Sequence, residues 1–571
     1  MKTIRLTAAQ AAIRHIARQL NEDGDPFIAG CWAIFGHGNV AGIGEALHSE
    51  RDNLQTWRGH NEQTMAHAAI AYSKQLCRRR AMMVTSSIGP GATNMVTAAA
   101  LAHVNRLPVL LMPGDVFAGR GPDPVLQQIE DFSDGTVSAN DCFRPVSRYF
   151  DRIMRPEQLL TALPRAFRTM TDPADCGPVT LAFCQDVQAE AWDWPEEFFE
   201  PKVWRIRRPQ PECFQIPVVE TQAGKSALPW DHPFNLGPVG VTGASSANAA
   251  CADADVVLGV GTRFQDFTTG SWALFGNPRR KLICLNVQAY DAAKHGAQPV
   301  CADAVAGLSA LASALGDARF VAPDPALKAD WFAAADTVTG APDAEDNALP
   351  TDMQVIGAVQ RSAAADTVVM CAAGTMPGEL HKLWKAGRPM SYHMEYGYSC
   401  MGYEIAGALG IKMAQPERDV VCMIGDGSYM MANSELATAA MMGVKITLVV
   451  TDNRGFGCIN RLQMSTGGAE FNNLLDHTQY ANPSRIDFAA HAAAMGAETR
   501  KVSKISELEA GLREARRATG PFVLVIDTDP YPITQAGGTW WDVAVPAVST
   551  REAVREARQN YLKNLKRQRA N

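Results

Sequence analysis

Short apolar runs alternate along the chain with longer alanine-rich stretches in helical spacing. Residues 81–85 and 108–112 have the length and composition of strands, and residues 63–75 and 91–103 have those of helices. Strands that alternate with helices in this way form parallel sheets with helices packed on their faces. The first 190 residues are therefore predicted to form a parallel α/β domain.

The same α/β rhythm occurs twice more. Further strands are predicted at residues 256–260, 281–287, 367–371, 420–424, 445–451 and 522–527. Two stretches rich in Pro and polar residues interrupt the rhythm. The first is 192–211, whose end overlaps the cluster 208–212, and the second is 322–350. We expect three doubly wound parallel-sheet domains, with a linker and central domain at 191–350 between domains at 1–190 and 351–571.

Composition agrees with a globular chain of several domains. The 571 residues are 47% hydrophobic and 20% charged, and no run reaches the roughly 18 apolar residues of a membrane span. The net charge of −7 and the lack of a long basic run before a solvated helix expected at 551–569 argue against nucleic acid as a partner. Residues 1–20 lack the apolar core of a secretory signal, so we expect a cytoplasmic protein.

The thirteen cysteines are scattered along the chain. They form no CxxC pair and show no Cys/His ligand spacing. This pattern argues against a zinc site and against a disulfide framework.

The strongest chemical signal is a pair of polar turns that follow predicted strands. Residues 420–424 run into Gly-Asp-Gly-Ser at 425–428, and residues 445–451 run into Asp-Asn-Arg-Gly at 452–455. A glycine turn at the carboxyl end of a strand lets backbone N–H groups approach a diphosphate. One strand–helix–strand unit separates Asp426 from Asn453, so their side-chain oxygens are placed to share a cation such as Mg²⁺.

These turns resemble the signature of the thiamine-diphosphate enzyme superfamily, which begins Gly-Asp-Gly and ends in an Asn pair. The chain has Asp452-Asn453 in place of two asparagines, and the metal-binding Asn corresponds to the second position. The resemblance implies that Asp426, Asn453 and the carbonyl of Gly455 bind Mg²⁺. It also implies that the backbone at Gly427 and Ser428 meets the diphosphate of thiamine diphosphate. The alternative is a glycine turn and a polar loop that only connect strands.

A second match is Arg-Gly-His-Asn-Glu at 58–62, just before an alanine-rich helix. By resemblance Glu62 is catalytic and also binds the cofactor, through N1′ of the aminopyrimidine ring. In the superfamily this Glu and the metal site come from different subunits, which implies a homodimer or homotetramer. Taken alone, Glu62 is better explained as a surface carboxylate at a helix start, where the helix dipole favours it.

Further matches lie elsewhere in the chain. The segment 395–401 resembles the one that presses an apolar side chain between the cofactor rings, with Met401 as that side chain and the carbonyl of Ser399 as an acceptor. Residues 371–376 resemble a second diphosphate loop, which includes Gly374. Gln127 lies where relatives carry an active-site Gln.

Two segments narrow the reaction by resemblance. Gly-His-Gly-Asn at 36–39 and Gly-Gly-Thr-Trp-Trp-Asp at 537–542 resemble the ring-opening hydrolases of myo-inositol breakdown, which convert a trihydroxylated cyclohexane-1,2-dione to a deoxy-glucuronic acid. His37 is then a candidate for proton transfer or for delivery of water; equally, it bonds only the loop backbone. Arg120 and Asn460 are candidates for binding ring hydroxyls.

Two other functions stay open at this point. One is a carboligase like acetohydroxyacid synthase, acting on 2-keto acids, and the other is an inactive scaffold that binds the cofactor. The Gly-x-Gly at 259–261 resembles a flavin-contacting strand of some relatives, but the following residues differ, so FAD is possible and not predicted. The segment from Tyr531 onward, with Trp540 and Trp541, is a candidate lid.

Overall fold

The computed structural model describes residues 2–122, 124–206, 216–316, 324–340, 343, 348–483 and 485–568. They fall into two compact units. Unit 1 comprises Met1–Arg207, Gly397–Glu417 and Ala432–Val444, and unit 2 comprises Arg208–Tyr396, Arg418–Met431 and Lys445–Asn571. The cluster 208–212, where the expected linker ends, lies outside the described residues.

Unit 1 is built on a parallel sheet with the strand order β4-β3-β5-β6-β9, in which β7 and β8 also pair with β9. The strands are β3 (Ile28–Ala33), β4 (Thr56–Trp57), β5 (Ala81–Thr85), β6 (Val109–Leu111), β7 (Gly114–Asp115), β8 (Tyr149–Ile153) and β9 (Pro178–Cys184). Buried strands such as β5 and β9 are almost wholly apolar, as a sheet covered on both faces requires.

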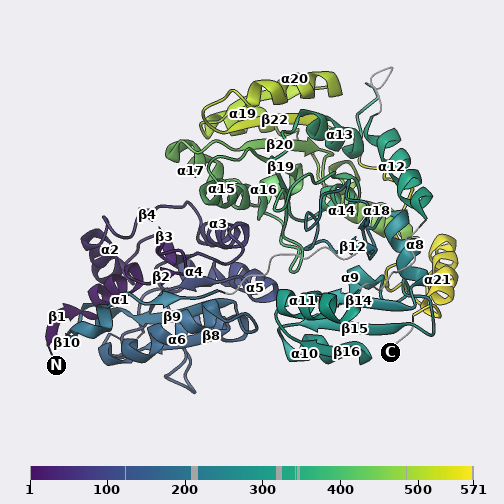
Figure 1. Ribbon diagram of the computed structural model, residues 1–571. Coiled ribbons are helices and arrows are strands. Elements are labelled where there is room, and N and C mark those ends of the chain that lie inside the picture. Colours follow the sequence, from purple (N-terminus) through teal and green to yellow (C-terminus); the bar gives the residue numbers. More distant parts are fainter. Residues whose placement is uncertain are drawn as a thin grey trace. The chain divides into compact units, whose positions relative to one another are not determined.

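The helices of unit 1 pack either on this sheet or on another helix of the unit (Figure 1). They are α1 (Ala8–Ala17), α2 (Glu45–Ser49), α3 (Glu62–Gln75), α4 (Pro90–Thr93), α5 (Val96–Asn105), α6 (Leu159–Thr171), α7 (Gln185–Ala189), α15 (Glu404–Ala414) and α17 (Glu435–Met442), with shorter turns η1 (Val40–Gly44), η2 (Ala139–Val146), η3 (Pro156–Gln158) and η4 (Glu196–Phe199). Helices α3 and α15 pack closely. A Cβ added to Gly410 of α15 would lie only 2.2 Å from the carbonyl oxygen of Ala68 in α3, so only glycine fits at this contact.

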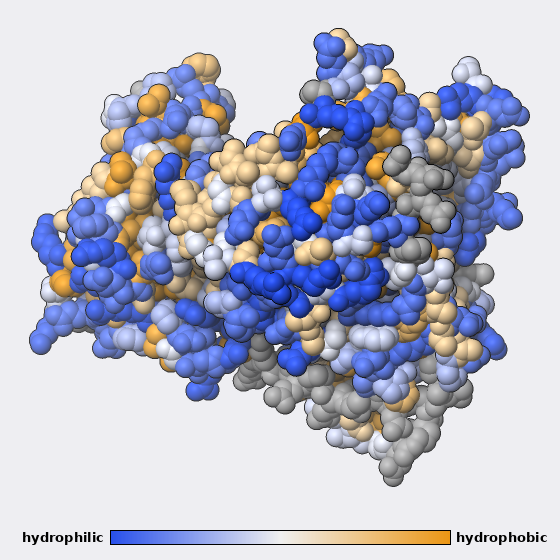
Figure 2. All heavy atoms as spheres, turned by 90° about the horizontal axis from the view of Figure 1, so that it is seen from above, coloured by the Kyte–Doolittle hydropathy of each residue, from blue (hydrophilic) through white to orange (hydrophobic). Residues whose placement is uncertain are grey.

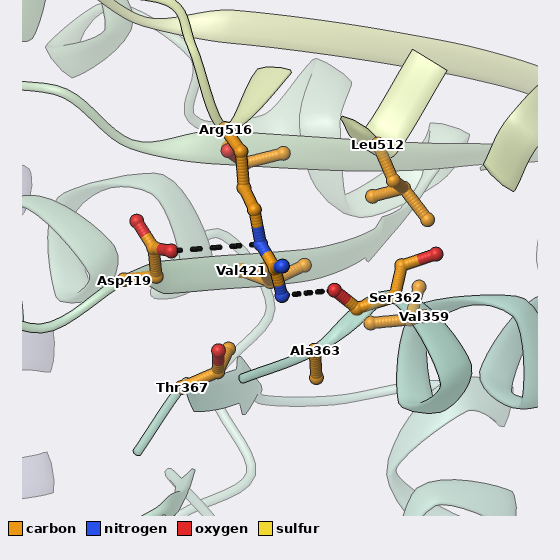
Figure 3. A pocket seen from close by; sticks show the side chains of 9 residues that line it. Val359, Ser362, Ala363, Thr367, Asp419, Val421, Leu512 and Arg516 are labelled. Atoms are coloured by element: carbon orange, nitrogen blue, oxygen red, sulfur yellow. Dashed lines mark hydrogen bonds and ion pairs between the residues drawn. The ribbon is translucent and has the colours of Figure 1, made fainter. Parts of the chain in front are cut away.

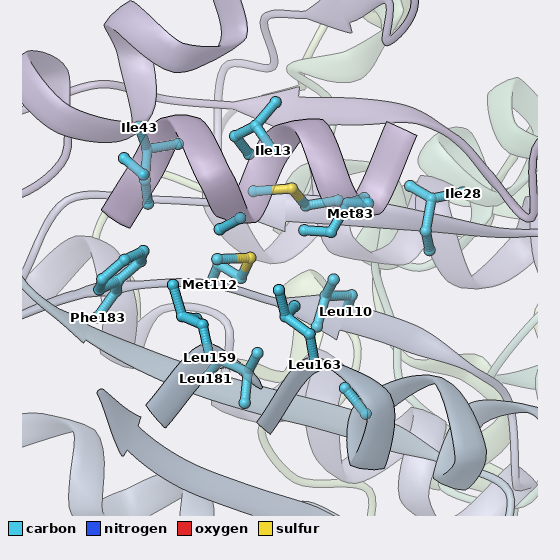
Figure 4. Packing of buried hydrophobic residues seen from close by; sticks show 14 of the residues in the cluster. Ile13, Ile28, Ile43, Met83, Leu110, Met112, Leu159, Leu163, Leu181 and Phe183 are labelled. Carbon is cyan, nitrogen blue, oxygen red and sulfur yellow. The ribbon is translucent and has the colours of Figure 1, made fainter. Parts of the chain in front are cut away.

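The core of unit 1 lies between the sheet and helices α1 and α6. Figure 4 shows Ile13 of α1, Met83 of β5 and Leu163 of α6 among its side chains, all fully buried. The apolar positions of α1 and α6 fall on one face of each helix, which is why both pack flat on the sheet.

The stretch from residue 192, where a linker is expected, contains strands. Residues 191–195 form β10 (Ala191–Pro195), antiparallel to β1 (Thr3–Thr7), and β11 (Val203–Trp204) pairs with β2 (Leu20–Asn21). Trp194, Phe199 and Trp204 are buried in the core of unit 1. The stretch from residue 192 that interrupts the predicted rhythm therefore contains ordered strands, because these aromatic side chains bury enough apolar surface to fix the backbone.

Unit 2 is built on a second parallel sheet, with the strand order β18-β17-β19-β20-β22-β21. Its strands are β17 (Val368–Cys371), β18 (Tyr392–Met394), β19 (Val420–Gly425), β20 (Thr447–Asp452), β21 (Glu498–Val502) and β22 (Phe522–Asp527). Smaller parallel pairings join β12 (Val218–Glu220) to β13 (Asn235–Pro238), and β14 (Val256–Val260), β15 (Lys281–Asn286) and β16 (Gln298–Cys301) in that order.

The helices of unit 2 flank these sheets. They are α8 (Ser245–Asp253), α9 (Asp266–Thr269), α10 (Ala289–Ala293), α11 (Ala304–Leu315), α12 (Pro325–Thr339), α13 (Asp352–Ser362), α14 (Thr375–Leu383), α16 (Asp426–Met431), α18 (Gly457–Ser465), α19 (Phe488–Ala494), α20 (Ile505–Ala515) and α21 (Glu552–Leu565), with turns η5 (Lys294–Gly296) and η6 (Leu475–His477). No helix among the described residues is long and apolar enough to cross a membrane. Figure 2 shows polar side chains over much of one face, with apolar ones between them.

The predicted α/β class is confirmed. The strands predicted at 81–85, 256–260 and 522–527 begin and end at the same residues as β5, β14 and β22. The helix expected at 91–103 is broken into α4 and α5 around Asn94, which ends α4. The division into three domains at 190 and 350 remains a prediction.

Candidate active site

Four predicted site residues of unit 1 follow strands of its sheet, three on loops and one at the start of a helix. His37 comes after β3, Glu62 after β4, and Arg120 and Gln127 after β7. The carboxyl ends of parallel strands share one edge of a sheet, which is where ligands bind in open α/β folds. The loop after β3 touches β7 there: a Cβ on Gly114 of β7 would lie 2.4 Å from the carbonyl oxygen of Gly38.

Glu62 is the first residue of α3 and is half-buried. Asn61 caps the helix, and its side chain accepts hydrogen bonds from the N–H groups of Gln63 (2.9 Å) and Thr64 (3.2 Å). The Glu62 carboxylate accepts a hydrogen bond of 2.9 Å from the Asn94 amide. Two independent contacts, the cap and the amide, therefore fix the position of this carboxylate.

The turn that carries His37 is rigid. The Asn39 side chain accepts from Gly36 N–H (3.0 Å) and donates to the Thr85 hydroxyl (3.1 Å), so it closes the turn and ties it to β5. The exposed His37 ring places Nε2 3.2 Å from the Leu126 carbonyl oxygen. This contact is the loop-backbone bond that the sequence left as one of two interpretations, and it brings His37 next to the loop of Gln127.

Gln127 itself is exposed and has a φ of 66°. Its carbonyl oxygen lies against Gly89, where a Cβ would be only 1.6 Å away. Arg120 is also exposed, on a loop whose N–H groups at Ala118 (2.8 Å) and Gly119 (2.9 Å) both donate to the Asp186 carboxylate. The structure thus places the His37 ring against Leu126, the residue before Gln127, and holds the Arg120 loop by a separate anchor.

In unit 2, Asp426 and Asn453 follow the neighbouring strands β19 and β20. Both residues are buried, and Oδ1 of each has no hydrogen-bond partner among the described residues. Buried oxygens without partners are rare and costly. A carboxylate and an amide oxygen are hard donors of the kind that Mg²⁺ takes, so these two atoms fit a magnesium ion.

The pKa of Asp426 is raised to about 7, first by burial and second by the nearby Asp452 carboxylate, although backbone N–H groups of Gly427, Asn453 and Gly455 oppose the shift. A buried carboxylate without a cation is poorly stabilised in its charged form. A divalent cation at this position favours the charged form.

The loop after Asn453 depends on Gly455. Its φ is 146°, and a Cβ there would lie 2.3 Å from the carbonyl oxygen of Asn473. Gly455 pairs with Leu474 in an isolated antiparallel bridge. The close approach fixes the loop that follows the strand, and with it the backbone of Gly455.

Two helix starts lie on the same sheet edge. Helix α14 follows β17 through Gly374, which has a φ of 102°, and α16 follows β19 and begins at Asp426. A Cβ on Gly374 or Gly425 would meet no atom within 4 Å, so there is open space at both turns. The N–H groups at helix starts bind phosphate oxygens, and Gly427 and the buried Ser428 lie in the first turn of α16.

Comparison with known proteins agrees with this geometry. Three family models match: the thiamine pyrophosphate enzyme N-terminal TPP binding domain over residues 14–134, the central domain over 211–311 and the C-terminal TPP binding domain over 372–526. Over 99% of both chains, the sequence is 43% identical to a protein of Geobacillus thermodenitrificans (strain NG80-2) named 3D-(3,5/4)-trihydroxycyclohexane-1,2-dione hydrolase. The chain belongs to the thiamine pyrophosphate enzyme family.

Other relatives carry the same name. A protein of Bacillus cereus, named 3D-(3,5/4)-trihydroxycyclohexane-1,2-dione hydrolase 2, is 42% identical over 100% of both chains. One of Bacillus anthracis is 41% identical over 100% of both chains. Thiamine pyrophosphate is the thiamine diphosphate expected from the sequence, so the expectation of this family is confirmed.

The remaining predicted residues have mixed surroundings. Ser399 is exposed with a φ of 54°, and Met401 is half-buried just before α15. The neighbouring Gly402 N–H donates to Glu404 over 2.9 Å, which fixes the backbone beside Met401. Asn460 on α18 is buried, and its amide donates to Glu470 over 2.8 Å. The roles expected of Ser399, Met401 and Asn460 stay predictions.

Three supporting residues were missed by the sequence reasoning. Asn39 closes the His37 turn, Asn94 bonds Glu62, and Asp186 anchors the Arg120 loop. Asn39 lies in a turn that the sequence singles out, but the side-chain partners of Asn39 and Asn94 lie on other elements. For Asp186, which follows β9, the sequence offers no local signal.

The C-terminal segment from Tyr531 onward, the candidate lid, is held in place by hydrogen bonds. Thr534 N–H and hydroxyl both donate to Glu379 of α14, and Gly538 N–H donates to the Gly243 carbonyl over 2.7 Å. The Trp541 ring N–H donates to Asp266 over 2.6 Å. A movement of this segment has to break these bonds.

A small cavity lies at the other edge of the unit 2 sheet (Figure 3). Its lining includes Thr367, Asp419 and Thr447, which lie at or just before the amino ends of β17, β19 and β20. Arg516 reaches across it to Asp419 and the Ser362 carbonyl. The cavity is therefore separate from the edge that carries Asp426 and Asn453.

Proposed function

We propose that this chain hydrolyses a carbon–carbon bond of 3D-(3,5/4)-trihydroxycyclohexane-1,2-dione and opens the ring to 5-deoxy-glucuronic acid. The observation that carries the proposal is the 41–43% identity, over 99% or more of the chain, to proteins named as hydrolases of this dione. Glu62, Asp426 and Asn453 are all present, as an active enzyme of the family needs. The reaction breaks the bond between the two carbonyl carbons and consumes one water.

Mg²⁺ is proposed to bind the Oδ1 atoms of Asp426 and Asn453 together with the carbonyl oxygen of Gly455. The support is the pair of buried oxygens without partners among the described residues. The diphosphate is proposed to bind the helix starts at Gly374 and at Gly427 and Ser428, because backbone N–H groups at helix starts bind phosphate oxygens and a Cβ on Gly374 or Gly425 would meet no atom within 4 Å. Thiamine diphosphate supplies a nucleophilic carbon and an electron sink for cleavage next to a carbonyl.

Glu62 is proposed to hold a proton at the aminopyrimidine ring and so to control the basicity of the cofactor. A carboxylate suits this role because it can accept and return a proton within one turnover. The Asn94 amide donates to Oε2 of Glu62, which leaves Oε1 for the ring. Met401 and the carbonyl of Ser399 are proposed to contact the cofactor from the segment before α15.

The substrate is proposed to lie against the loops that carry His37, Arg120 and Gln127. A ring with several hydroxyl groups needs hydrogen-bonding partners, and these exposed polar side chains provide them at one sheet edge. His37 is proposed to move a proton or deliver the water from its other ring nitrogen, because Nε2 contacts the Leu126 carbonyl. Asn460 is proposed to meet a ring hydroxyl through Oδ1, which has no partner among the described residues.

The active protein is proposed to be a cytoplasmic homodimer or homotetramer. Large apolar side chains are exposed on α16 and α18, the helices that precede and follow Asn453 in unit 2: Met430 (48%), Met431 (55%) and Ile459 (50%). Exposed apolar side chains that gather near a site are typical of a surface that another chain covers.

The proposal is tested with purified protein, thiamine diphosphate and Mg²⁺, by following loss of the dione and release of acid while pyruvate is assayed in parallel. We expect dione opening that requires the cofactor and falls on the order of a hundredfold or more in Glu62→Gln. The matched control is Glu45→Gln, an exposed Glu that begins α2 in the same unit. Pyruvate turnover without dione opening points instead to a carboligase, and inactivity on both points to the scaffold.

A further inference from the structure

A buried hydrogen-bond network underlies the first turn of α3. Its centre is Glu435, the first residue of α17, which is 1% exposed. Oε1 of Glu435 accepts from the backbone N–H of His60 (3.2 Å) and from the hydroxyl of Thr64 (2.6 Å). These two donors lie on either side of Glu62 in the sequence.

The Glu435 carboxylate also contacts the His60 ring indirectly, through the Thr438 hydroxyl. Oε2 of Glu435 accepts from the Thr438 hydroxyl, and the oxygen of that hydroxyl lies 2.7 Å from Nδ1 of His60. Thr438 is 1% exposed, whereas the His60 ring is exposed. One carboxylate thus holds both the backbone and the ring of His60.

Counting hydrogens fixes the direction of each bond. A carboxylate only accepts, so the single hydroxyl hydrogen of Thr438 points to Glu435. Nδ1 of His60 must then carry a hydrogen and donate it to Thr438. The neutral His60 ring is therefore the Nδ1–H tautomer, and its Nε2 presents a lone pair.

We propose that Glu435 is a positioning residue for Glu62, acting through Thr64 and through the backbone and ring of His60. This inference rests on the proposed function, because it assigns importance to the placement of Glu62. The first turn of a helix has few internal hydrogen bonds and frays easily. Glu435 supplies a buried acceptor that holds this turn in addition to the Asn61 cap, while Asn94 holds the carboxylate of Glu62 itself.

The chemistry of Glu435→Gln makes the inference testable. The amide keeps its oxygen toward the two donors at Thr64 and His60, so its NH₂ group faces Thr438. The Thr438 hydroxyl then accepts from the amide and turns its hydrogen toward Nδ1 of His60. The variant is therefore expected to switch the His60 ring from the Nδ1–H to the Nε2–H tautomer.

The first experiment records ¹⁵N NMR spectra of the protein without cofactor, labelled at histidine, with His60→Gln used to assign the signal. The Nδ1–H tautomer is expected in the wild type, the Nε2–H tautomer in Glu435→Gln, and loss of a single tautomer in Thr438→Val. Glu190→Gln, an exposed Glu of the same unit, is expected to match the wild type. An Nε2–H ring in the wild type, or the same tautomer in the wild type and Glu435→Gln, overturns the network.

The second experiment follows exchange of the C2 hydrogen of bound thiamine diphosphate with solvent. Glu435→Gln is expected to slow this exchange on the order of tenfold to a hundredfold, because a small displacement of a catalytic group has effects of this size. Cofactor affinity and the thermal unfolding temperature are expected to stay near those of Glu190→Gln. If Glu62→Gln abolishes exchange and Glu435→Gln does not slow it, the positioning role is wrong and the proposed function stands. If Glu62→Gln exchanges normally, the proposed function fails.

Discussion

Asp426 and Asn453 each keep one buried side-chain oxygen without a partner among the described residues, at the ends of two adjacent parallel strands. The backbone N–H groups of Asn453 and Gly455 also stabilise the Asp426 carboxylate. These observations support the proposal that the two residues share one cation.

Replacement of Asp426 tests this site directly. Asp426→Ala removes the only charged ligand proposed, so we expect Mg²⁺-dependent binding of thiamine diphosphate to weaken on the order of a hundredfold. The measurement is a thermal-shift titration of the cofactor with and without Mg²⁺. The control is Asp303→Ala, which removes a helix-capping Asp of the same unit and should keep the Mg²⁺-dependent shift. A Mg²⁺-dependent shift that persists in Asp426→Ala would contradict the proposed metal site.

Gly89 determines the position of the Gln127 loop. Its φ is 62°, and a Cβ would lie 1.6 Å from the Gln127 carbonyl oxygen, so Gly89→Ala must displace this loop. We expect the KM for the dione to rise roughly tenfold or more, with a smaller change in kcat, since the loop is proposed to bind substrate. Gly121→Ala is the control, because a Cβ there meets no atom within 4 Å. Steady-state kinetics in which both variants behave alike would contradict the prediction.

His67 should make unit 1 sensitive to acid. Burial lowers its pKa from 6.5 to about 3, and neither ring nitrogen has a hydrogen-bond partner among the described residues. The unfolded chain binds the proton more readily, so the stability from neutral His67 is complete above pH 6.5 and is lost as the pH falls toward 3. At pH 5 the loss amounts to about 2 kcal/mol.

The test of this pH dependence is urea unfolding at pH 7.5 and at pH 5. The His67→Leu variant is expected to lose about 2 kcal/mol less than the wild type between the two conditions, since it has no proton to gain. His48→Leu, which alters an exposed His of the same unit, is expected to follow the wild type. An equal acid loss in His67→Leu and the wild type would show that His67 is not responsible.

The ion pair of Asp115 and Arg152 should contribute strongly to unit 1. Its N–O distance is 2.7 Å, and the side chains are 0% and 10% exposed. Asp115→Ala leaves a buried guanidinium without its main partner, so we expect a loss of about 3 to 5 kcal/mol in the free energy of unfolding. Asp193→Ala breaks the exposed pair with Arg5, whose side chains are 60% and 66% exposed, and should cost about 0 to 1 kcal/mol. Urea titration of both variants measures the difference.

The sequence alone determined the α/β class, the positions of eight strands of the parallel sheets, and the family. Strands such as β5 and β19 are continuous apolar runs that end in glycine-rich turns, and such local patterns depend only on nearby residues. For the same reason Glu62, Asp426 and Asn453 could be identified as candidates, since each lies directly at an element boundary that the sequence predicts.

Only the tertiary structure decided which distant residues support these candidates. Asn94 on Glu62, Asp186 under the Arg120 loop and Glu435 beneath the first turn of α3 each join segments far apart in the chain. The strands β10 and β11 were not predicted for a similar reason, because Trp194 and Trp204 are buried by other parts of unit 1. Contacts of this kind depend on how the strands are ordered in the sheet, which the local hydrophobic pattern does not determine.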